Sequence, residues 1–323
     1  MSDREEKTGK NDNGKKNKGG KRNKIVAIEM IILVLLIMSA VAIFIQRDKS
    51  VKEAAKIHIQ KAKKTEQTPQ AAQKENDIEE ETEGTEEETD DRDASVPDRS
   101  NFAVQPGVSV GTTEQSDEKI VYLTLDDGPS DNTQAVLDIL DKYNAKATFF
   151  VTGEMPEYKD MIKAAYDKGH TIGMHTYSHD YAKVYASVDA YFQDLDQIGQ
   201  MVQEEIGYVP CFIRFPGGSS NTVSKKYTAG IMSTLVQEVQ NRGYQYYDWN
   251  GSSGDGAVRT TEELVAQATS FDSNNIILLC HDSHGKQTTV EALPQIIEHY
   301  QSLGYTFKAL DRDSFVAHHG VNN

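Results

Sequence analysis

Two adjacent aspartates, Asp126 and Asp127, could do two different pieces of chemistry in this chain of 323 residues. They follow an apolar segment and precede a Gly128-Pro129 turn. One carboxylate can bind a divalent cation while its neighbour accepts a proton from water. Aspartate is also common in turns and at helix starts, so the pair by itself fits a structural role equally well.

A pair of histidines supplies the ligands that a metal site would need. His175 and His179 are four residues apart, which places both imidazoles on one side of a helix or tight turn. Two imidazoles and one carboxylate would leave coordination positions open for water, as hydrolytic centres require. The spacing alone is weak evidence, and its weight comes from the neighbouring clusters.

Five polar clusters share one position, because each follows the C-terminal end of a predicted strand. They are Asp126–Pro129, His175–His179, Arg214–Gly218, Asp248-Trp249 and His281-Asp282. In α/β barrels that rim builds the active site. Together the clusters predict a hydrolytic metal centre, although each alone has an ordinary structural explanation.

The elements that would carry these clusters alternate from residue 120 onward. The predicted strands are Val121–Leu125, Ala147–Thr152, Thr171–Met174, Phe212–Phe215, Gln245–Asp248, Ile276–Cys280 and Thr306–Ala309. The predicted helices are Thr133–Tyr143, Tyr158–Lys168, Val188–Ile206, Lys225–Arg242, Glu262–Ser270 and Val290–Ser302. Helix terminators are expected at Gly169, Gly207, Gly243 and Gly304. This alternation predicts a parallel sheet in a closed or nearly closed α/β barrel, with an open doubly wound sheet as the alternative.

The clusters resemble the five sequence motifs of the polysaccharide deacetylases, the NodB-homology group of carbohydrate esterase family four. The likeness covers about residues 118–312 and runs through Thr124–Pro129, His175–His179, Arg214–Gly218 and Leu279–His281. The resemblance implies a distorted (β/α)7 barrel. It also implies that Asp127, His175 and His179 bind a divalent metal, usually zinc and sometimes cobalt, manganese or nickel.

The same resemblance implies roles for the remaining polar residues. Asp126 would be the general base that activates water, and His281 the general acid that protonates the leaving amine. Arg214 would hold Asp126 in place. The backbone N–H of Gly217 would help to stabilise the oxyanion, which needs preorganised positive charge.

The fourth motif departs from the family pattern. The family usually shows Asp-x-x-Asp-Trp, and this chain reads Ser252-Ser253-Gly254-Asp255-Gly256. Asp255 is retained and is expected to pair with His281. Gly256 replaces the usual tryptophan, so an apolar wall of the acetyl pocket must come from elsewhere, with Trp249 and Leu279 as candidates.

Composition limits the class of partner. The net charge is −16, and no Lys/Arg cluster appears beyond the N-terminus, so nucleic acid is not the expected partner. The two cysteines, Cys211 and Cys280, lie in apolar contexts and are expected to be buried rather than paired or metal-bound.

The first 115 residues differ from the rest. Residues 1–24 form a basic tail, and Ile25–Gln46 is apolar except for Glu29, Ser39 and the terminal Gln46. At about 1.5 Å per residue this run can cross a bilayer, and the basic residues before it predict a cytoplasmic N-terminus. The alternative is a cleaved signal peptide, but the apolar run is longer than a signal core.

The segments after the predicted anchor complete the expected organisation. Residues 47–115 are predicted to be an extracellular linker, a short basic helix followed by a disordered acidic stretch. The catalytic domain is predicted at 116–316, with a tail at 317–323.

These features together predict a membrane-anchored deacetylase that acts outside the cell on N-acetylglucosamine residues of peptidoglycan. Alternative substrates are N-acetylmuramic acid, chitin oligomers, an exopolysaccharide or an O-acetyl ester of xylan. A wall-binding pseudoenzyme and a cytoplasmic metal-dependent amidohydrolase are the alternatives from other classes.

Overall fold

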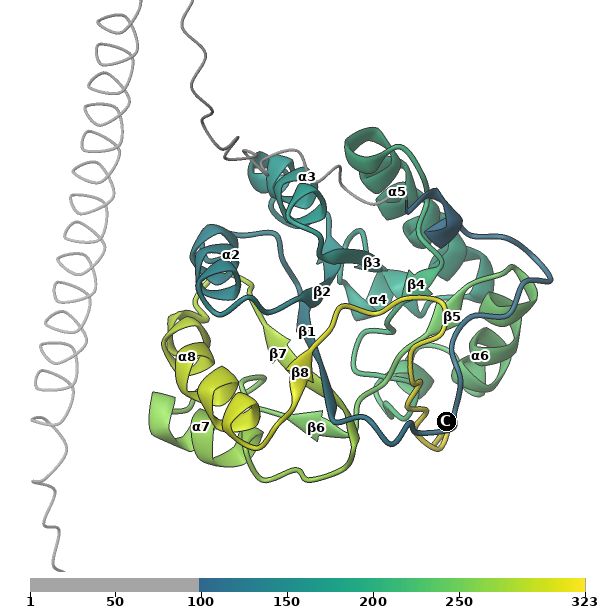
Figure 1. The fold of residues 1–323 in the computed structure, drawn as a ribbon. Coiled ribbons are helices and arrows are strands. Elements are labelled where there is room, and N and C mark those ends of the chain that lie inside the picture. The colour runs from purple at the N-terminus through teal and green to yellow at the C-terminus, as the bar shows by residue number, and fades with distance from the viewer. Residues whose placement is uncertain (1–98, 323) are drawn as a thin grey trace, which may run out of the picture. The chain divides into compact units, whose positions relative to one another are not determined.

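The computed structural model describes residues 99–322 (Figure 1). The predicted basic tail, the predicted membrane anchor Ile25–Gln46 and the linker up to residue 98 lie outside the described residues. In the part that is described, no helix combines the length and the apolar character needed to cross a membrane.

A parallel sheet forms the centre of the domain. Its strands are β1 (Ile120–Asp126), β2 (Ala147–Thr152), β3 (Thr171–Thr176), β4 (Phe212–Ile213), β5 (Gln245–Tyr246), β6 (Gly251–Ser252), β7 (Asn275–His281) and β8 (Thr306–Phe307). The strand order is β5-β4-β3-β2-β1-β7-β6, and β8 pairs with the start of β1. Every residue of β1, β2 and β3 is buried, which explains why these strands read as nearly continuous apolar runs.

Helices cover the outer side of the curled sheet (Figure 1). They are α2 (Thr133–Lys142), α3 (Asp160–Asp167), α4 (Tyr181–Val184), α5 (Val188–Ile206), α6 (Ile231–Asn241), α7 (Thr261–Ala268) and α8 (Gln287–Ser302). Three short 3-10 helices are η1 (Ser100–Phe102), η2 (Pro156–Tyr158) and η3 (Ser224–Lys226). The predicted bounds of α5 are correct, because Ser187 caps its start through Ala190 N and Gly207 ends it at φ +89°.

The prediction of one helix over Lys225–Arg242 is wrong. Gly230 adopts φ +76°, which a continuous α-helix cannot contain, and it separates η3 from α6. Apolar spacing on either side of such a break resembles one longer helix, so periodicity does not reveal it.

The predicted α/β barrel appears in the structure as a curled parallel sheet. Among the described residues, the sheet is not closed into a barrel by hydrogen bonds between its two edge strands. The strand path ends at β5 and at β6, and no pairing joins these two strands within residues 99–322. The two-residue strand β6 was not predicted, because Gly251-Ser252 carries no apolar pattern.

Two packed layers lie on the two faces of β1. Val121, Leu123 and Leu125 pack in the cluster shared with the helices, whereas Ile120 and Tyr122 belong to a second cluster on the opposite face. Because side chains alternate along a strand, Asp126 continues the row of Ile120 and Tyr122 at the C-terminal end.

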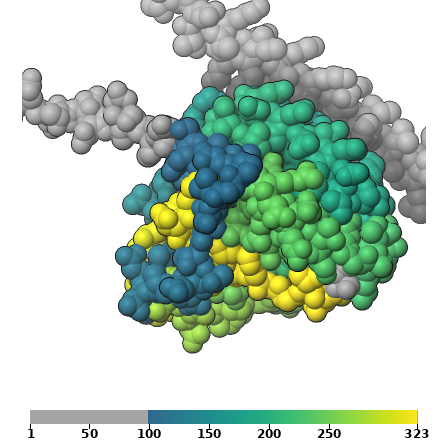
Figure 2. Space-filling view, turned by 90° about the vertical axis from the view of Figure 1, so that its right-hand side faces the viewer, coloured from purple at the N-terminus to yellow at the C-terminus, as the bar shows by residue number. Residues whose placement is uncertain are grey.

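Segments from both ends of the domain cover this second face. Phe102 packs edge-on against Phe212 at 5.2 Å, and the Cys211 N–H donates to Phe102 O at 2.8 Å. Val110, Phe315 and Val316 are buried in the same cluster, and Figure 2 shows the blue N-terminal residues beside the yellow C-terminal ones.

Both end segments also make contacts from outside the predicted range 116–316 of the catalytic domain. The structure places residues 99–115, assigned from sequence to the linker, on the domain, and it places the first residues of the predicted tail there as well. A sheet that does not close needs other chain segments to bury its inner face, which sequence periodicity cannot show.

Candidate metal centre and active site

Strand order brings three of the predicted clusters together. β3, β2, β1 and β7 are successive neighbours in the sheet, so the chain after β1, the end of β3 and the end of β7 share one rim. Asp126 and His281 are register partners across β1 and β7. The predicted base and the predicted acid are thus placed side by side by backbone pairing.

Asp127, His175 and His179 form the one group of potential metal ligands found among residues 99–322. Asp127 Oδ1 lies 3.4 Å from His175 Nε2 and 3.3 Å from His179 Nε2. Tetrahedral zinc bonds of about 2.0–2.2 Å would separate two ligand atoms by about 3.3–3.6 Å. The two distances from Asp127 therefore match those expected around a zinc-sized cation, and all three ligand atoms lie within 4.8 Å of one another.

The protonation of the group also suits a cation. The Nδ1–H of His175 donates to Arg214 O at 2.7 Å, which leaves its Nε2 lone pair toward Asp127. Burial lowers the pKa of His175, which favours the neutral imidazole that binds metals. Asp127 Oδ1 is buried and has no hydrogen-bond partner in the described part of the chain, as expected of an oxygen atom that would bind a cation.

Asp127 remains a carboxylate in spite of its burial. Burial by itself would raise the pKa of Asp127, but the neighbouring histidines His175, His179 and His281 outweigh it and lower that pKa. The anionic oxygen needed for a metal bond is therefore available at neutral pH.

The backbone is strained at two of the three candidate ligands. Asp127 has φ +68° and His179 has φ +46°, in the left-handed region that costs about 1–2 kcal/mol for residues other than glycine. The next residue is Gly128, and a side chain would not fit at this position, because a Cβ there would lie 2.3 Å from Asp282 Oδ1. Asp282 is fully buried, and burial raises its pKa to about 7.

Asp194 on α5 braces the segment between the two histidines, a role that no sequence motif indicates. Its carboxylate accepts from Tyr177 N at 2.6 Å, from Ser178 N at 3.2 Å and from Ser178 Oγ at 2.5 Å. The available signal was a charged residue on the buried face of α5, between Tyr191 and Leu195.

Replacing Asp194 with asparagine should weaken metal binding about 10- to 100-fold, the usual effect of losing an outer partner of a metal ligand. The backbone turn that places His179 would lose its charged acceptor. Competition with a chromophoric chelator measures the change. Asp196→Asn, an exposed change on the same helix, is the matched control, and equal affinities in the two variants would contradict the bracing role.

Arg214 and Asp126 form a buried ion pair next to the candidate metal ligands. Arg214 Nη1 donates to Asp126 Oδ1 and to Thr124 Oγ1, both at 2.7 Å, and its Nε donates to Tyr247 O at 2.8 Å. Arg214 is 0% exposed and Asp126 is 3% exposed. Because the guanidinium has fixed partners on several sides, it holds Asp126 in one orientation, as predicted.

His281 pairs with Asp255, as the sequence predicts. Its Nδ1 lies 2.7 Å from Asp255 Oδ1, its backbone N–H donates to Asp255 Oδ2 at 2.8 Å, and its Nε2 lies 4.0 Å from Asp127 Oδ2. Burial would lower the pKa of His281, but Asp255 and the nearby aspartates outweigh it and raise that pKa to about 9. His281 is therefore a protonated donor at neutral pH.

Changing Asp255 to asparagine should move the alkaline limb of the kcat/KM profile to lower pH. The charge of Asp255 raises the pKa of His281, and an opposite charge at this range shifts a pKa by about one to three units. An acid must be protonated to act, so the variant should lose activity at a lower pH. Thr289→Val, the control, removes only one hydrogen-bond donor to Asp255 and should shift the alkaline limb of the profile less. An alkaline limb that stays in place in Asp255→Asn would contradict the pairing of Asp255 with His281.

The loop after β4 holds two glycines in conformations that other residues avoid. Gly217 has φ +75° and Gly218 has φ +76°. A Cβ at Gly217 would lie 2.7 Å from the hydroxyl of Tyr181, whose ring packs edge-on against His179 at 5.8 Å. The loop therefore lies close to the metal group, where the predicted oxyanion donor is needed.

The departure in the fourth motif leaves open space. Apart from its two chain neighbours, no residue of the described chain has an atom within 4 Å of a Cβ built on Gly256. Trp249, one of the two candidates for the missing wall, packs beside the loop after β4, where a Cβ on Gly218 would meet its ring at 3.0 Å.

His170 has a structural position, and both cysteines are buried as predicted. His170 is buried and accepts from Ala147 N at 3.2 Å, and burial lowers its pKa to about 3. Cys211 and Cys280 are buried and form no disulfide within residues 99–322.

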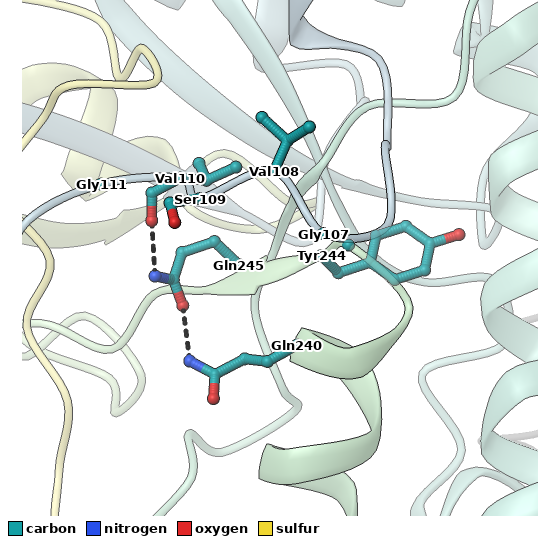
Figure 3. Close-up of a pocket in the computed structure, with 9 residues that line it drawn as sticks. Gly107, Val108, Ser109, Val110, Gly111, Gln240, Tyr244 and Gln245 are labelled. Carbon is teal, nitrogen blue, oxygen red and sulfur yellow. Dashed lines mark hydrogen bonds between the residues drawn. The ribbon is translucent and has the colours of Figure 1, made fainter.

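A separate pocket lies away from these residues. It has a volume of about 380 Å³ and is lined by residues 107–111 and by Gln240, Gly243, Tyr244 and Gln245 (Figure 3). Gln245 bridges it by donating to Val110 O at 2.7 Å. It contains no predicted site residue.

Comparisons with known proteins agree with this geometry. Residues 113–236 match the polysaccharide deacetylase family. A peptidoglycan-N-acetylglucosamine deacetylase of Bacillus cereus is 30% identical over 226 residues, which cover 65% of this chain and 78% of that protein. A chitin deacetylase of Arthroderma benhamiae is 36% identical over 182 residues, 54% of this chain and 46% of that protein.

A solved structure extends the likeness to three dimensions. The catalytic domain of a peptidoglycan N-acetylglucosamine deacetylase from Eubacterium rectale shares 45% sequence identity and superposes with a TM-score of 0.63. The match covers 67% of this chain and 98% of that chain.

Proposed function

The chain belongs to the polysaccharide deacetylase family, and we propose that it removes acetyl groups from N-acetylglucosamine residues of peptidoglycan. The observation that carries the proposal is the Asp127–His175–His179 group, with a base candidate and an acid candidate on neighbouring strands beside it. The names of the similar proteins from Bacillus cereus and Eubacterium rectale support peptidoglycan as the polymer.

The proposed cofactor is a divalent metal, with zinc as the first choice. Asp127, His175 and His179 would hold it, since two imidazoles and one carboxylate are typical of catalytic zinc. When bound, such a cation would polarise the amide carbonyl and lower the pKa of water. Cobalt, manganese or nickel would suit the same donors.

The proposed mechanism assigns a separate task to each remaining residue. Asp126, held by Arg214, takes a proton from the attacking water. The Gly217 N–H supports the negative charge that develops on the carbonyl oxygen. His281, kept protonated by Asp255, gives its proton to the leaving nitrogen, because an unprotonated amine leaves poorly.

The experiment that tests the proposal is acetate release by the purified full-length chain. The substrates are N-acetylglucosamine oligomers, peptidoglycan and acetylated xylan, each with and without a chelator and with zinc restored afterwards. Release from peptidoglycan that a chelator stops supports the proposal. Faster release from chitin oligomers or xylan would reassign the polymer, and no release from any substrate would favour a wall-binding pseudoenzyme.

The proposed location is the cell membrane, with the N-terminus in the cytoplasm and the catalytic domain outside. The support is the sequence alone: the basic residues 1–24, the apolar run Ile25–Gln46 and the acidic stretch after it. Protease added to intact cells should remove the catalytic domain from the membrane fraction. A catalytic domain protected until the cells are lysed would contradict this topology.

A further inference from the structure

The C-terminal segment Ala317–His319 lies against the chain that leads out of β5. The Asp248 N–H donates to Ala317 O at 3.0 Å. The ring of His318 stacks on Tyr246 with centroids 3.9 Å apart. Both contacts are made with residues 246–248, before the segment reaches the loop that follows β4.

Asp248 joins this segment to that loop. Its carboxylate is fully buried and accepts from Ser219 N at 2.8 Å, from Ser219 Oγ at 2.5 Å and from His319 N at 2.7 Å. Its backbone carbonyl accepts from Arg214 Nη2 at 3.2 Å. One residue therefore contacts the loop, the C-terminal segment and the arginine that holds Asp126.

His319 makes a second set of contacts with the same parts. Its Nε2–H donates to Trp249 O at 2.6 Å, so its Nδ1 can accept from Ser220 Oγ at 3.2 Å. Its carbonyl oxygen lies 3.3 Å from Ser219 Oγ, and its ring packs edge-on against Trp249 at 4.8 Å. The imidazole thus sits between the loop and Trp249.

The loop needs such support for a physical reason. Gly217 and Gly218 both have positive φ, and glycine loses more conformational freedom on ordering than any other residue. An oxyanion donor is effective only if its N–H is already in place when charge develops. Contacts at Ser219 and Ser220, directly after the two glycines, supply that restraint.

We propose that His319 and Asp248 are positioning residues, and that the C-terminal segment Ala317–His319 clasps the Gly217–Ser220 loop and Trp249 in their working arrangement. This inference rests on the proposed deacetylase function. Neither residue belongs to the predicted catalytic set, and neither contacts the metal ligands in the described contacts. Their removal should therefore affect kcat and leave metal affinity unchanged.

The test compares His319→Ala with His318→Ala in the full-length chain. His318 is the adjacent histidine and contacts Tyr246 but not the loop, so it is the matched control. We expect kcat to fall about 10- to 100-fold in His319→Ala, the usual effect of a small misplacement of reacting groups. KM and the metal dissociation constant should stay within about twofold. His319→Gln keeps a donor for Trp249 O and should recover part of kcat.

Trp249 offers a readout that does not depend on turnover, because it is the single tryptophan of the chain. Loss of the His319 contact should increase the quenching of its fluorescence by acrylamide, while His318→Ala should not. If the wild type shows no deacetylase activity but this difference in quenching is present, the proposed function fails and the clasp stands. Equal quenching and equal kcat in the two variants would overturn the clasp, as would a loss of metal affinity in His319→Ala.

Discussion

Replacing Asp126 with asparagine should lower kcat by about 10²- to 10⁴-fold, the contribution of a general base. The amide has nearly the same shape as the carboxylate, but it cannot take a proton from water. Its oxygen can still accept the hydrogen bond from Arg214 Nη1 that now measures 2.7 Å. The metal ligands are unchanged, so metal content should stay at the wild-type level.

The same substitution should also reduce stability. Arg214 is fully buried and would lose its only charged partner among the described contacts. Breaking a buried pair in this way costs up to about 3–5 kcal/mol, and the retained hydrogen bond should keep the loss at the lower end. Thermal unfolding therefore has to be measured beside kcat, at a temperature where both proteins are folded.

Asp131→Asn is the control for Asp126→Asn. Asp131 lies five residues further along and is an exposed residue paired with His284. Its substitution should leave kcat and stability close to wild type. Wild-type acetate release by a folded, metal-loaded Asp126→Asn protein would rule out Asp126 as the base.

Replacing His175 with alanine should weaken metal binding by more than about 100-fold, beyond the 10–100-fold typical of outer partners of a ligand. His175 supplies a buried Nε2 at 3.4 Å from Asp127 Oδ1, and alanine leaves only His179 and Asp127 at the site. Acetate release should fall to the level of the chelated wild type. Metal content after dialysis, measured by mass spectrometry, should fall from one ion per chain toward zero.

Stability provides an independent check on the same variant. A ligand that binds only the folded state stabilises it by about 2.7 kcal/mol at 100 times its dissociation constant. The wild type should therefore melt at a higher temperature when zinc is added, and His175→Ala should not. His284→Ala, which removes an exposed histidine, is the control and should keep the zinc-dependent rise. An equal rise in His175→Ala would exclude this histidine as a ligand.

Several features of the fold are local enough to be predicted from sequence. The buried runs of β1, β2 and β3 were placed within about two residues, because strands covered on both faces read as apolar segments. Left-handed glycines after helices were also placed correctly, at Gly169 and Gly207 among others. These signals depend on a few neighbouring residues, so no knowledge of distant contacts is needed.

The candidate site was predictable for a related reason. Asp126, His175 and His281 lie at the C-terminal ends of strands, and in a parallel sheet those ends meet at one rim. The register pairing of Asp126 with His281 follows directly once β1 and β7 are neighbours. The family resemblance then assigned the roles of base, acid and metal ligand to individual residues, which their spacing alone had not done.

Other features depend on contacts between distant segments. Gly251-Ser252 is a strand only because β7 lies beside it, and residues 99–115 belong to the domain only because the sheet leaves an inner face to cover. Asp194 reaches Tyr177 and Ser178 through the packing of α5 on β3. None of these pairings produces a periodic pattern.

The sequence by itself, with the family resemblance that its motifs carry, predicted the candidate chemistry of this protein: Asp127, His175 and His179 as metal ligands, and the pairs Asp126–Arg214 and His281–Asp255. Only the tertiary structure decided what holds these groups in place. Asp194 accepts a hydrogen bond from Tyr177 N, between the two histidines, and His319 contacts Ser220 in the loop after β4. Support of this kind comes from hydrogen bonds across long sequence separations, and the three-dimensional path of the chain sets which groups meet.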